Sequence, residues 1–146
     1  MVREIRKEDY QLYMDLSREF YDSEAVLHTI PESYREATWK EMMRSPEFVR
    51  GYILEKDGAP AGYGLTSRTF SQEAGGKVVW LEELYIRSEY RCHGLGKEFF
   101  RYVDEKIAPE VKRLRLEIEP ENLRAKKLYL SLGYEDLLYT QMVKDV

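Results

Sequence analysis

Residues 78–107 read VVWLEELYIRSEYRCHGLGKEFFRYVDEKI, and this stretch decides the fold of the chain. It opens with a largely apolar run up to Ile86, which is typical of a strand covered on both faces. Apolar side chains from Leu95 to Ile107 then recur at helical spacing. Residues 113–119 alternate apolar with charged side chains, as a second strand does. The order strand, helix, strand predicts a parallel crossover.

Two amphipathic helices are predicted before this stretch, after a short opening strand at residues 2–5. Apolar residues at three- and four-residue spacing predict the first helix from Tyr10 to Tyr21. Pro31 favours the first position of the second helix, and Ser45-Pro46 ends it. We expect the second helix to pack through four side chains, namely Tyr34, Ala37, Thr38 and Met42.

A hairpin is predicted in the middle of the chain. Residues 48–55 and 61–69 read as two strands, and Asp57-Gly58 between them is a turn pair typical of hairpins. Together with the strand before Ile86, this segment predicts three consecutive strands.

The C-terminal part predicts one helix and two further strands. Asn122 can cap a helix over residues 123–132, and Gly133 is placed as its end. Residues 134–139 and 141–146 read as a final pair of strands. The full order is βααβββαβαββ. This order predicts an α/β (α+β) fold in which helices flank a mixed, mostly antiparallel sheet with one parallel βαβ unit.

The composition excludes several classes of function. The 146 residues match one globular domain, residues 1–146. The 27 acidic and 23 basic residues give a net charge of -4, which disfavours nucleic acid as a partner. Cys92 is the only cysteine, so no intramolecular disulfide forms and a cytoplasmic location is expected. The two histidines give no metal-binding spacing, and no apolar run is long enough for a bilayer, so we expect neither a metal nor a membrane partner.

The loop Arg91-Cys92-His93-Gly94-Leu95-Gly96 carries the strongest chemical signal. Its two glycines follow a strand and open a helix, where backbone N–H groups can hold a phosphate. A dinucleotide fingerprint would need glycine at Phe99, and a Walker A loop would need serine or threonine at Glu98. A nucleotide hydrolase is therefore disfavoured. Taken alone, the two glycines are equally explained as the shape of a turn.

Three segments together resemble the GNAT superfamily of acyl-CoA-dependent N-acyltransferases. They are residues 83–86, 91–96 and 122–134, and the predicted order of elements also matches that fold. The two most specific parts are an Arg/Gln-x-x-Gly-x-Gly/Ala loop and an Asn...Ala...Leu-Tyr...Leu-Gly-Tyr/Phe segment. The resemblance covers essentially the whole chain, and it implies acetyl-CoA as cosubstrate.

The resemblance also implies how the donor binds. In the family, backbone N–H groups at the helix start hold the pyrophosphate, and the pantetheine arm pairs with the central strand. The implied donor-binding residues are Leu84, Tyr85 and Ile86 of the strand, Arg91, Cys92, His93, Gly94, Leu95, Gly96 and Lys97 of the loop, and Asn122 and Tyr129. Asn122 is equally explained as a helix N-cap. Cys92 replaces the commonest family residue, glycine, and is expected to have no role as a nucleophile.

Direct transfer to an amine needs an acid and a base. By resemblance, Tyr129 is the expected general acid, because a phenol stays protonated at neutral pH. The alternative is that its ring only packs beneath the donor. The expected bases, in order, are Glu82, Glu117 and Glu83. Alternation along the strand sends Glu82 and Glu83 to opposite faces, and a bulge would change which face each one sees. For all three, an ion pair or exposure to water without catalytic work is the alternative.

The turn after the first helix is expected to bind the acceptor, again by resemblance. It combines Tyr21, Asp22, Glu24 and His28, and aromatic with acidic groups suit a cation. We therefore expect a small primary amine, either a polyamine, an amino-acid-like molecule or an aminoglycoside-like one. Two alternatives stay open, a protein or peptide N-acetyltransferase and a non-catalytic acyl-CoA sensor. A homodimer is expected through exposed aromatic residues or the terminal strands.

Overall fold

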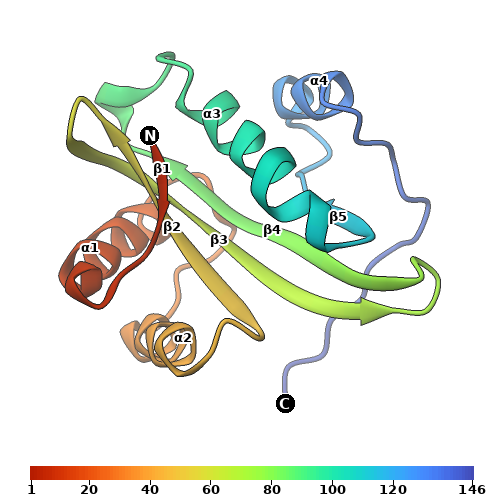
Figure 1. The fold of residues 1–146 in the computed structure, drawn as a ribbon, viewed down its shortest axis with the longest axis horizontal. Helices are drawn as coiled ribbons and strands as arrows, with labels where there is room; N and C mark the ends of the chain where they lie inside the picture. The colour runs from red at the N-terminus through yellow and green to blue at the C-terminus, as the bar shows by residue number, and fades with distance from the viewer. The chain divides into compact units, whose positions relative to one another are not determined.

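The computed structural model describes residues 1–146, and the chain divides into two compact units, Met1–Leu116 and Glu117–Val146. The first unit holds a five-stranded sheet and three α-helices, and the second holds one α-helix (Figure 1). None of the helices combines the length and the apolar character that crossing a membrane requires.

The strands lie across the sheet in the order in which they occur along the chain. They are β1 Val2–Glu4, β2 Val49–Lys56, β3 Ala59–Ser71, β4 Gly76–Ile86 and β5 Arg113–Leu116. Neighbouring strands are antiparallel except β4 and β5, which are parallel. Asp57 and Gly58 both have left-handed backbone conformations, with φ of 51° and 80°, and they form the turn between β2 and β3. The mixed sheet, the hairpin and the parallel crossover are therefore confirmed.

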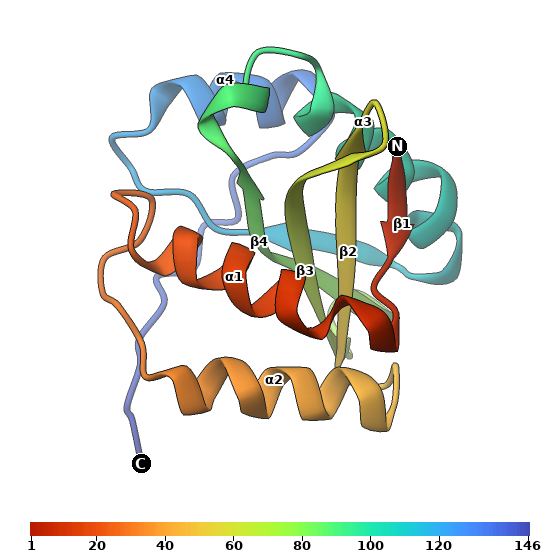
Figure 2. The same cartoon turned by 90° about the vertical axis from the view of Figure 1, so that its left-hand side faces the viewer.

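Helices cover both faces of this sheet. The helices α1 (Tyr10–Tyr21) and α2 (Glu32–Arg44) lie together on one face, and α3 (Leu95–Tyr102) lies on the other (Figures 1 and 2). We call these the α1 face and the α3 face. A single π-helical turn, Val103–Ile107, extends α3. The α1 face buries Tyr13, Phe20, Ile53 and Tyr63, whereas the α3 face buries Tyr52, Leu95, Phe99 and Val103.

Two glycines of β3 allow its neighbours to approach closely. A Cβ atom on Gly64 would lie 2.6 Å from the ring of Phe99, and a Cβ atom on Gly62 would lie 2.1 Å from the carbonyl oxygen of Tyr85. Any side chain at these positions would push α3 or the end of β4 outward. The glycines therefore set how tightly α3 and β4 pack against β3.

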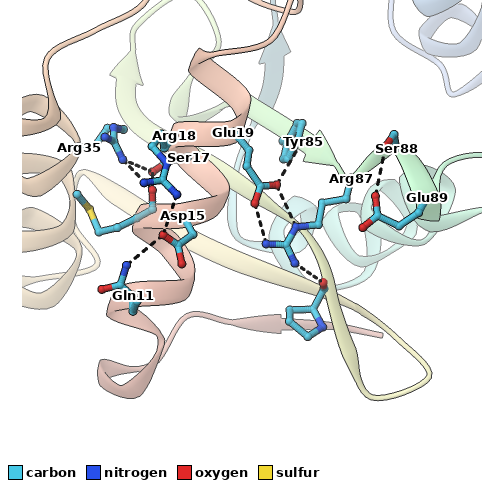
Figure 3. Close-up of polar contacts among 12 residues, drawn as sticks. Gln11, Asp15, Ser17, Arg18, Glu19, Arg35, Tyr85, Arg87, Ser88 and Glu89 are labelled. Atoms are coloured by element: carbon cyan, nitrogen blue, oxygen red, sulfur yellow. Dashed lines mark hydrogen bonds and ion pairs between the residues drawn. The ribbon is translucent and has the colours of Figure 1, made fainter.

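The packed side of α2 differs from the predicted one. Tyr34 and Ala37 are exposed, so their predicted burial is wrong, although Met42 packs against the α1 face as expected. The buried residue of α2 is Arg35, which donates a hydrogen bond of 2.7 Å to the carbonyl oxygen of Met14 in α1 (Figure 3). An apolar pattern cannot reveal this contact, because arginine buries its aliphatic stem while its guanidinium finds a polar partner.

The second unit contains α4, Leu123–Ser131. The side chain of Asn122 accepts a hydrogen bond of 3.1 Å from the backbone amide of Ala125, and Gly133 follows the helix with φ of 89°. The predicted cap and end of this helix are therefore confirmed. The predicted strands 134–139 and 141–146 are wrong, since these residues form no regular secondary structure. A strand needs hydrogen-bonding partners and a covered face, yet Leu138 and Met142 are 94% and 96% exposed.

Candidate active site

A β-bulge in β4 shapes the candidate site. Leu65 of β3 lies opposite Glu83, and the next residue, Thr66, lies opposite Leu81. Glu82 is therefore an extra residue without an opposite partner, which is the definition of a bulge. The bulge changes the direction of the side chains that follow it, so simple alternation cannot place the two glutamates.

The bulge brings both glutamates to the α1 face. Tyr63 donates a hydrogen bond to Glu83, and Ser67 donates one to Glu82. Tyr63 and Ser67 are four residues apart in a part of β3 that pairs with β2 without interruption, so they share one face of the sheet. The charge of Glu82 also raises the pKa of Glu83. The prediction that the two glutamates lie on opposite faces is therefore wrong, and the bulge is the physical reason.

Glu83 is held by phenols from two different elements. Tyr21, the last residue of α1, donates to one carboxylate oxygen, and Tyr63 of β3 donates to the other. Burial raises the pKa of Glu83 above its ordinary value, while the two phenol hydrogen bonds lower it. Burial and the nearby carboxylate also raise the pKa of both tyrosines, which keeps them protonated as donors.

The four predicted acceptor residues differ in their contacts with the two glutamates. Only Tyr21 reaches the two glutamates, through its hydrogen bond to Glu83. Asp22, Glu24 and His28 lie exposed in the loop between α1 and α2, and none of their side chains makes a hydrogen bond or an ion pair. Tyr21 is therefore the member of the predicted set that the structure connects to the carboxylates.

A second contact between α1 and β4 was not predicted from the sequence. Glu19 accepts two hydrogen bonds from Arg87, at 3.0 and 2.8 Å, and one of 3.4 Å from the hydroxyl of Tyr85 (Figure 3). Arg87 also donates to the carbonyl oxygen of Pro60 at 3.2 Å. The residues are 68 positions apart in sequence, and no local pattern connects them. The contact fixes the C-terminal half of α1 against the end of β4.

The loop before α3 presents backbone amides at the end of β4. Gly94 is the N-cap of α3 and has no side chain that could cap the helix. In the first turn, the backbone amide of Glu98 donates a hydrogen bond of 3.0 Å to the carbonyl oxygen of Gly94. The amides that precede Glu98 in the first turn therefore point out of the helix without intrahelical partners. Arg91 donates to the carbonyl oxygen of Ile86 at 2.9 Å, which holds the loop to the strand. This arrangement fits an anion at the helix N-terminus.

Cys92 has a backbone conformation that favours glycine. Its φ is 64°, in the left-handed region, and Gly94 follows with φ of 82°. The thiol is exposed. The loop thus keeps a conformation suited to glycine although a cysteine occupies the position.

One edge of β4 is open beside this loop. β5 pairs with β4 only from Val78 to Leu81, and β5 ends at Leu116, so it is shorter than the predicted strand 113–119. Within the first unit, residues 83–86 have a strand partner on the β3 side alone. The backbone of Leu84, Tyr85 and Ile86 can therefore accept an extended ligand as an added strand.

The second unit carries the remaining predicted residues. Burial raises the pKa of Tyr129, and its ring lies 6.0 Å from that of Tyr134 between centroids. Asn122 caps α4, as its alternative interpretation requires. Glu117 is exposed at the start of this unit.

The order of elements and the sheet topology of the first unit agree with the fold expected of the acyl-CoA-dependent acyltransferases. The chain belongs to the acetyltransferase (GNAT) family, whose sequence model matches residues 5–134. The chain is thus an enzyme of acetyl transfer, and the expected family is confirmed.

Individual relatives agree with this assignment. The chain is 30% identical over 146 residues to the thialysine N-epsilon-acetyltransferase of Bos taurus, covering 94% of this chain and 85% of the relative. It is 31% identical over 77 residues to the spermine/spermidine N(1)-acetyltransferase of Bacillus subtilis (strain 168), covering 51% of this chain and 50% of the relative. A solved structure of AAC(6')-Iy with a CoA-containing bisubstrate analog superposes with a TM-score of 0.80 at 17% identity, covering 100% of this chain and 97% of that one. The likeness to that structure confirms the fold.

Proposed function

We propose that this acetyltransferase moves an acetyl group from acetyl-CoA to the primary amine of a small molecule. The observation that carries the proposal is the bulge, which brings the carboxylates of Glu82 and Glu83 to one face of β4. Carboxylates attract a protonated amine, and one of them can remove its proton. The names of the relatives, which include thialysine, spermine and spermidine as substrates, support a small amine as acceptor.

The donor site is proposed along the open edge of β4 and the following loop. Acetyl-CoA supplies the acetyl group as a reactive thioester. The amides of residues 92–97 would hold its pyrophosphate, where the dipole of α3 also favours an anion. The backbone of residues 84–86 would pair with its pantetheine arm. No atom lies within 4 Å of the position that a Cβ on Gly94 would occupy, so the loop leaves room for a phosphate.

Glu83 is the base that the geometry supports best. Burial raises the pKa of Glu83 above its ordinary value, and a higher pKa makes a carboxylate a stronger general base. Glu82 is more exposed and is proposed to attract the ammonium group as it arrives. Glu117 is second among the bases expected from the sequence, and its role as a base stays a prediction.

Tyr129 is proposed as the general acid. Its raised pKa keeps the phenol protonated, and the thiolate of CoA needs that proton when it leaves. The backbone amide of Leu84 is proposed to stabilise the oxyanion. The exposed residues Asp22, Glu24 and His28 are proposed to complete the acceptor side beyond Tyr21.

A cytoplasmic location and a homodimer are also proposed. The exposed thiol of Cys92 fits a reducing compartment. The exposed apolar residues of the C-terminal segment, among them Leu138 and Met142, support association with a second copy.

Release of free thiol from acetyl-CoA tests the function. We expect release in the presence of lysine, cadaverine or spermidine, and we expect Glu83→Gln to lower kcat/KM by about 10²- to 10⁴-fold. Glu110→Gln is the matched control, because Glu110 is an exposed carboxylate on the turn after α3 without a side-chain contact. Turnover with peptides alone would support the peptide N-acetyltransferase alternative. Binding of acetyl-CoA without thiol release for any amine would support the sensor.

A further inference from the structure

Arg115 of β5 lies over the ring of Trp80 in β4. Its guanidinium carbon is 4.0 Å from the ring centroid, and the two residues are paired in the parallel register of these strands. At this distance the cation is attracted to the face of the indole ring. The ring positions the guanidinium, which carries five N–H donors for hydrogen bonds to further groups.

The guanidinium of Arg115 has no carboxylate partner in the structure. Arg113, two residues earlier on the same face of β5, is paired with Glu73 at 3.4 Å, but no hydrogen bond or ion pair involves Arg115. Arg115 is half-buried, so its charge is partly removed from water. A planar guanidinium that is fixed in place and unpaired is well suited to bind a carboxylate through two parallel hydrogen bonds.

A chain of contacts connects Arg115 with the two glutamates. Trp80 lies directly opposite Ser67 in the pairing of β3 with β4, so the two side chains share one face. Ser67 in turn donates its hydroxyl to Glu82. Arg115, Trp80, Ser67 and Glu82 therefore form one continuous surface on the α1 face, with a positive group at one end and negative groups at the other.

The spacing of this surface suits a short zwitterion. Trp80 and Glu82 are two residues apart, and β5 is the next strand, so the backbone positions of Arg115 and Glu82 lie on the order of 8 Å apart. A basic amino acid has a carboxylate at one end and an amine at the other, so its charges complement those of this surface. A polyamine, which has only positive groups, would place a cation against Arg115.

We propose that the acceptor is an α-amino acid whose side chain ends in a primary amine, with its carboxylate bound by Arg115 and its side-chain amine at Glu82 and Glu83. This inference rests on the proposed function and specifies its acceptor. Arg115 then determines the specificity for the acceptor, because it binds a carboxylate that diamines lack. Acetylation is expected on the side-chain nitrogen.

The test compares lysine with cadaverine, which is lysine without its carboxylate, in thiol release by wild-type protein and by Arg115→Gln. We expect the variant to lose about 10- to 100-fold in kcat/KM for lysine, as is typical when a charged hydrogen-bond partner is removed, and to change by less than about 3-fold for cadaverine. Arg113→Gln is the matched control and should leave the ratio of the two substrates unchanged, because that arginine is already paired with Glu73. Cadaverine also controls for folding, since a misfolded variant would lose both activities.

Several outcomes would overturn the inference. An equal loss for lysine and cadaverine in Arg115→Gln would assign Arg115 a structural role, and unchanged kcat/KM for both substrates would remove it from substrate binding. If wild-type protein acetylates cadaverine but not lysine, the proposed function stands and the amino acid acceptor fails. If no amine is acetylated, the proposed function fails, and equilibrium dialysis with labelled lysine then decides the inference. Lysine binding that Arg115→Gln abolishes would support the carboxylate site, whereas absence of binding to wild-type protein would refute it.

Discussion

At the scale of single residues, the pKa of Glu83 is set by two opposing influences. Burial penalises the charged carboxylate and raises the pKa, while the hydroxyls of Tyr21 and Tyr63 stabilise the charge and lower it. The phenols therefore keep Glu83 able to ionise in a place where a carboxyl group would otherwise hold its proton to a higher pH.

Tyr63→Phe tests this balance. Removing one phenol donor should raise the pKa of Glu83, so the acidic limb of the pH profile of kcat/KM should move to higher pH. The same profile for Tyr102→Phe is the control, because Tyr102 packs on the α3 face. A limb that stays in place for Tyr63→Phe, or that moves equally in both variants, would argue against Glu83 as the titrating base.

Cys92 is a second residue whose conformation has a measurable cost. A residue with a side chain in the left-handed region is disfavoured by about 1 kcal/mol relative to the ordinary helical region. Cys92→Gly should therefore raise the free energy of unfolding by at most about 1 kcal/mol, and Cys92→Val should lower it by about 1–2 kcal/mol because a β-branched residue fits this region poorly. Urea denaturation measures the free energy of unfolding of both variants. A Cys92→Val variant as stable as the wild type would contradict the left-handed backbone conformation at this position.

At the scale of elements, two contacts fix α1 to β4 and the residue that follows it. Tyr21 contacts Glu83 in β4, and Glu19 contacts Arg87 just after its end. The hydrogen bonds from Arg87 hold the pKa of Glu19 below its usual value. The ion pair therefore stabilises the fold fully above the usual carboxylate range and loses this effect as the pH falls through the lowered pKa of Glu19.

Glu19→Gln should lower the free energy of unfolding at neutral pH by about 0.5–1 kcal/mol, a modest value because the pair is partly exposed. The difference from the wild type should vanish in acid, where Glu19 is protonated in both the folded and the unfolded chain. Denaturation curves at neutral and acidic pH measure the difference, with Asp15→Asn as a control for an exposed pair on the same helix. A difference that persists in acid would mean that Glu19 acts through packing.

At the scale of the whole molecule, the C-terminal segment bears on assembly. Val143 is 89% exposed, and the apolar residues Leu138 and Met142 are exposed to a similar degree. Exposed apolar side chains that lie close together favour burial against another surface. We predict that the full chain sediments as a dimer and that a chain ending at Tyr134 sediments as a monomer. Sedimentation equilibrium measures both masses, and equal association of the two chains would exclude the segment from the interface.

The sequence predicted the helices and the five strands of the first unit well, but it wrongly added two C-terminal strands and did not predict how distant segments meet. The hairpin at Asp57-Gly58 and the helix after Gly94 follow from local rules on turns and apolar spacing, so they could be read directly. The bulge at Glu82 depends on pairing with β3, and the phenol of Tyr21 reaches Glu83 across 62 positions. Contacts of this kind leave no local pattern, which is why the candidate residues could be named but not arranged.

The shortness of β5 has a consequence for the enzyme without its donor. Within the first unit, residues 82–86 of β4 have no partner strand on the β5 side, and an open edge is a template for pairing with another chain. A thioester donor lying along that edge would shield it from such pairing. Depletion of the donor would accordingly favour aggregation of the protein as well as halting its chemistry.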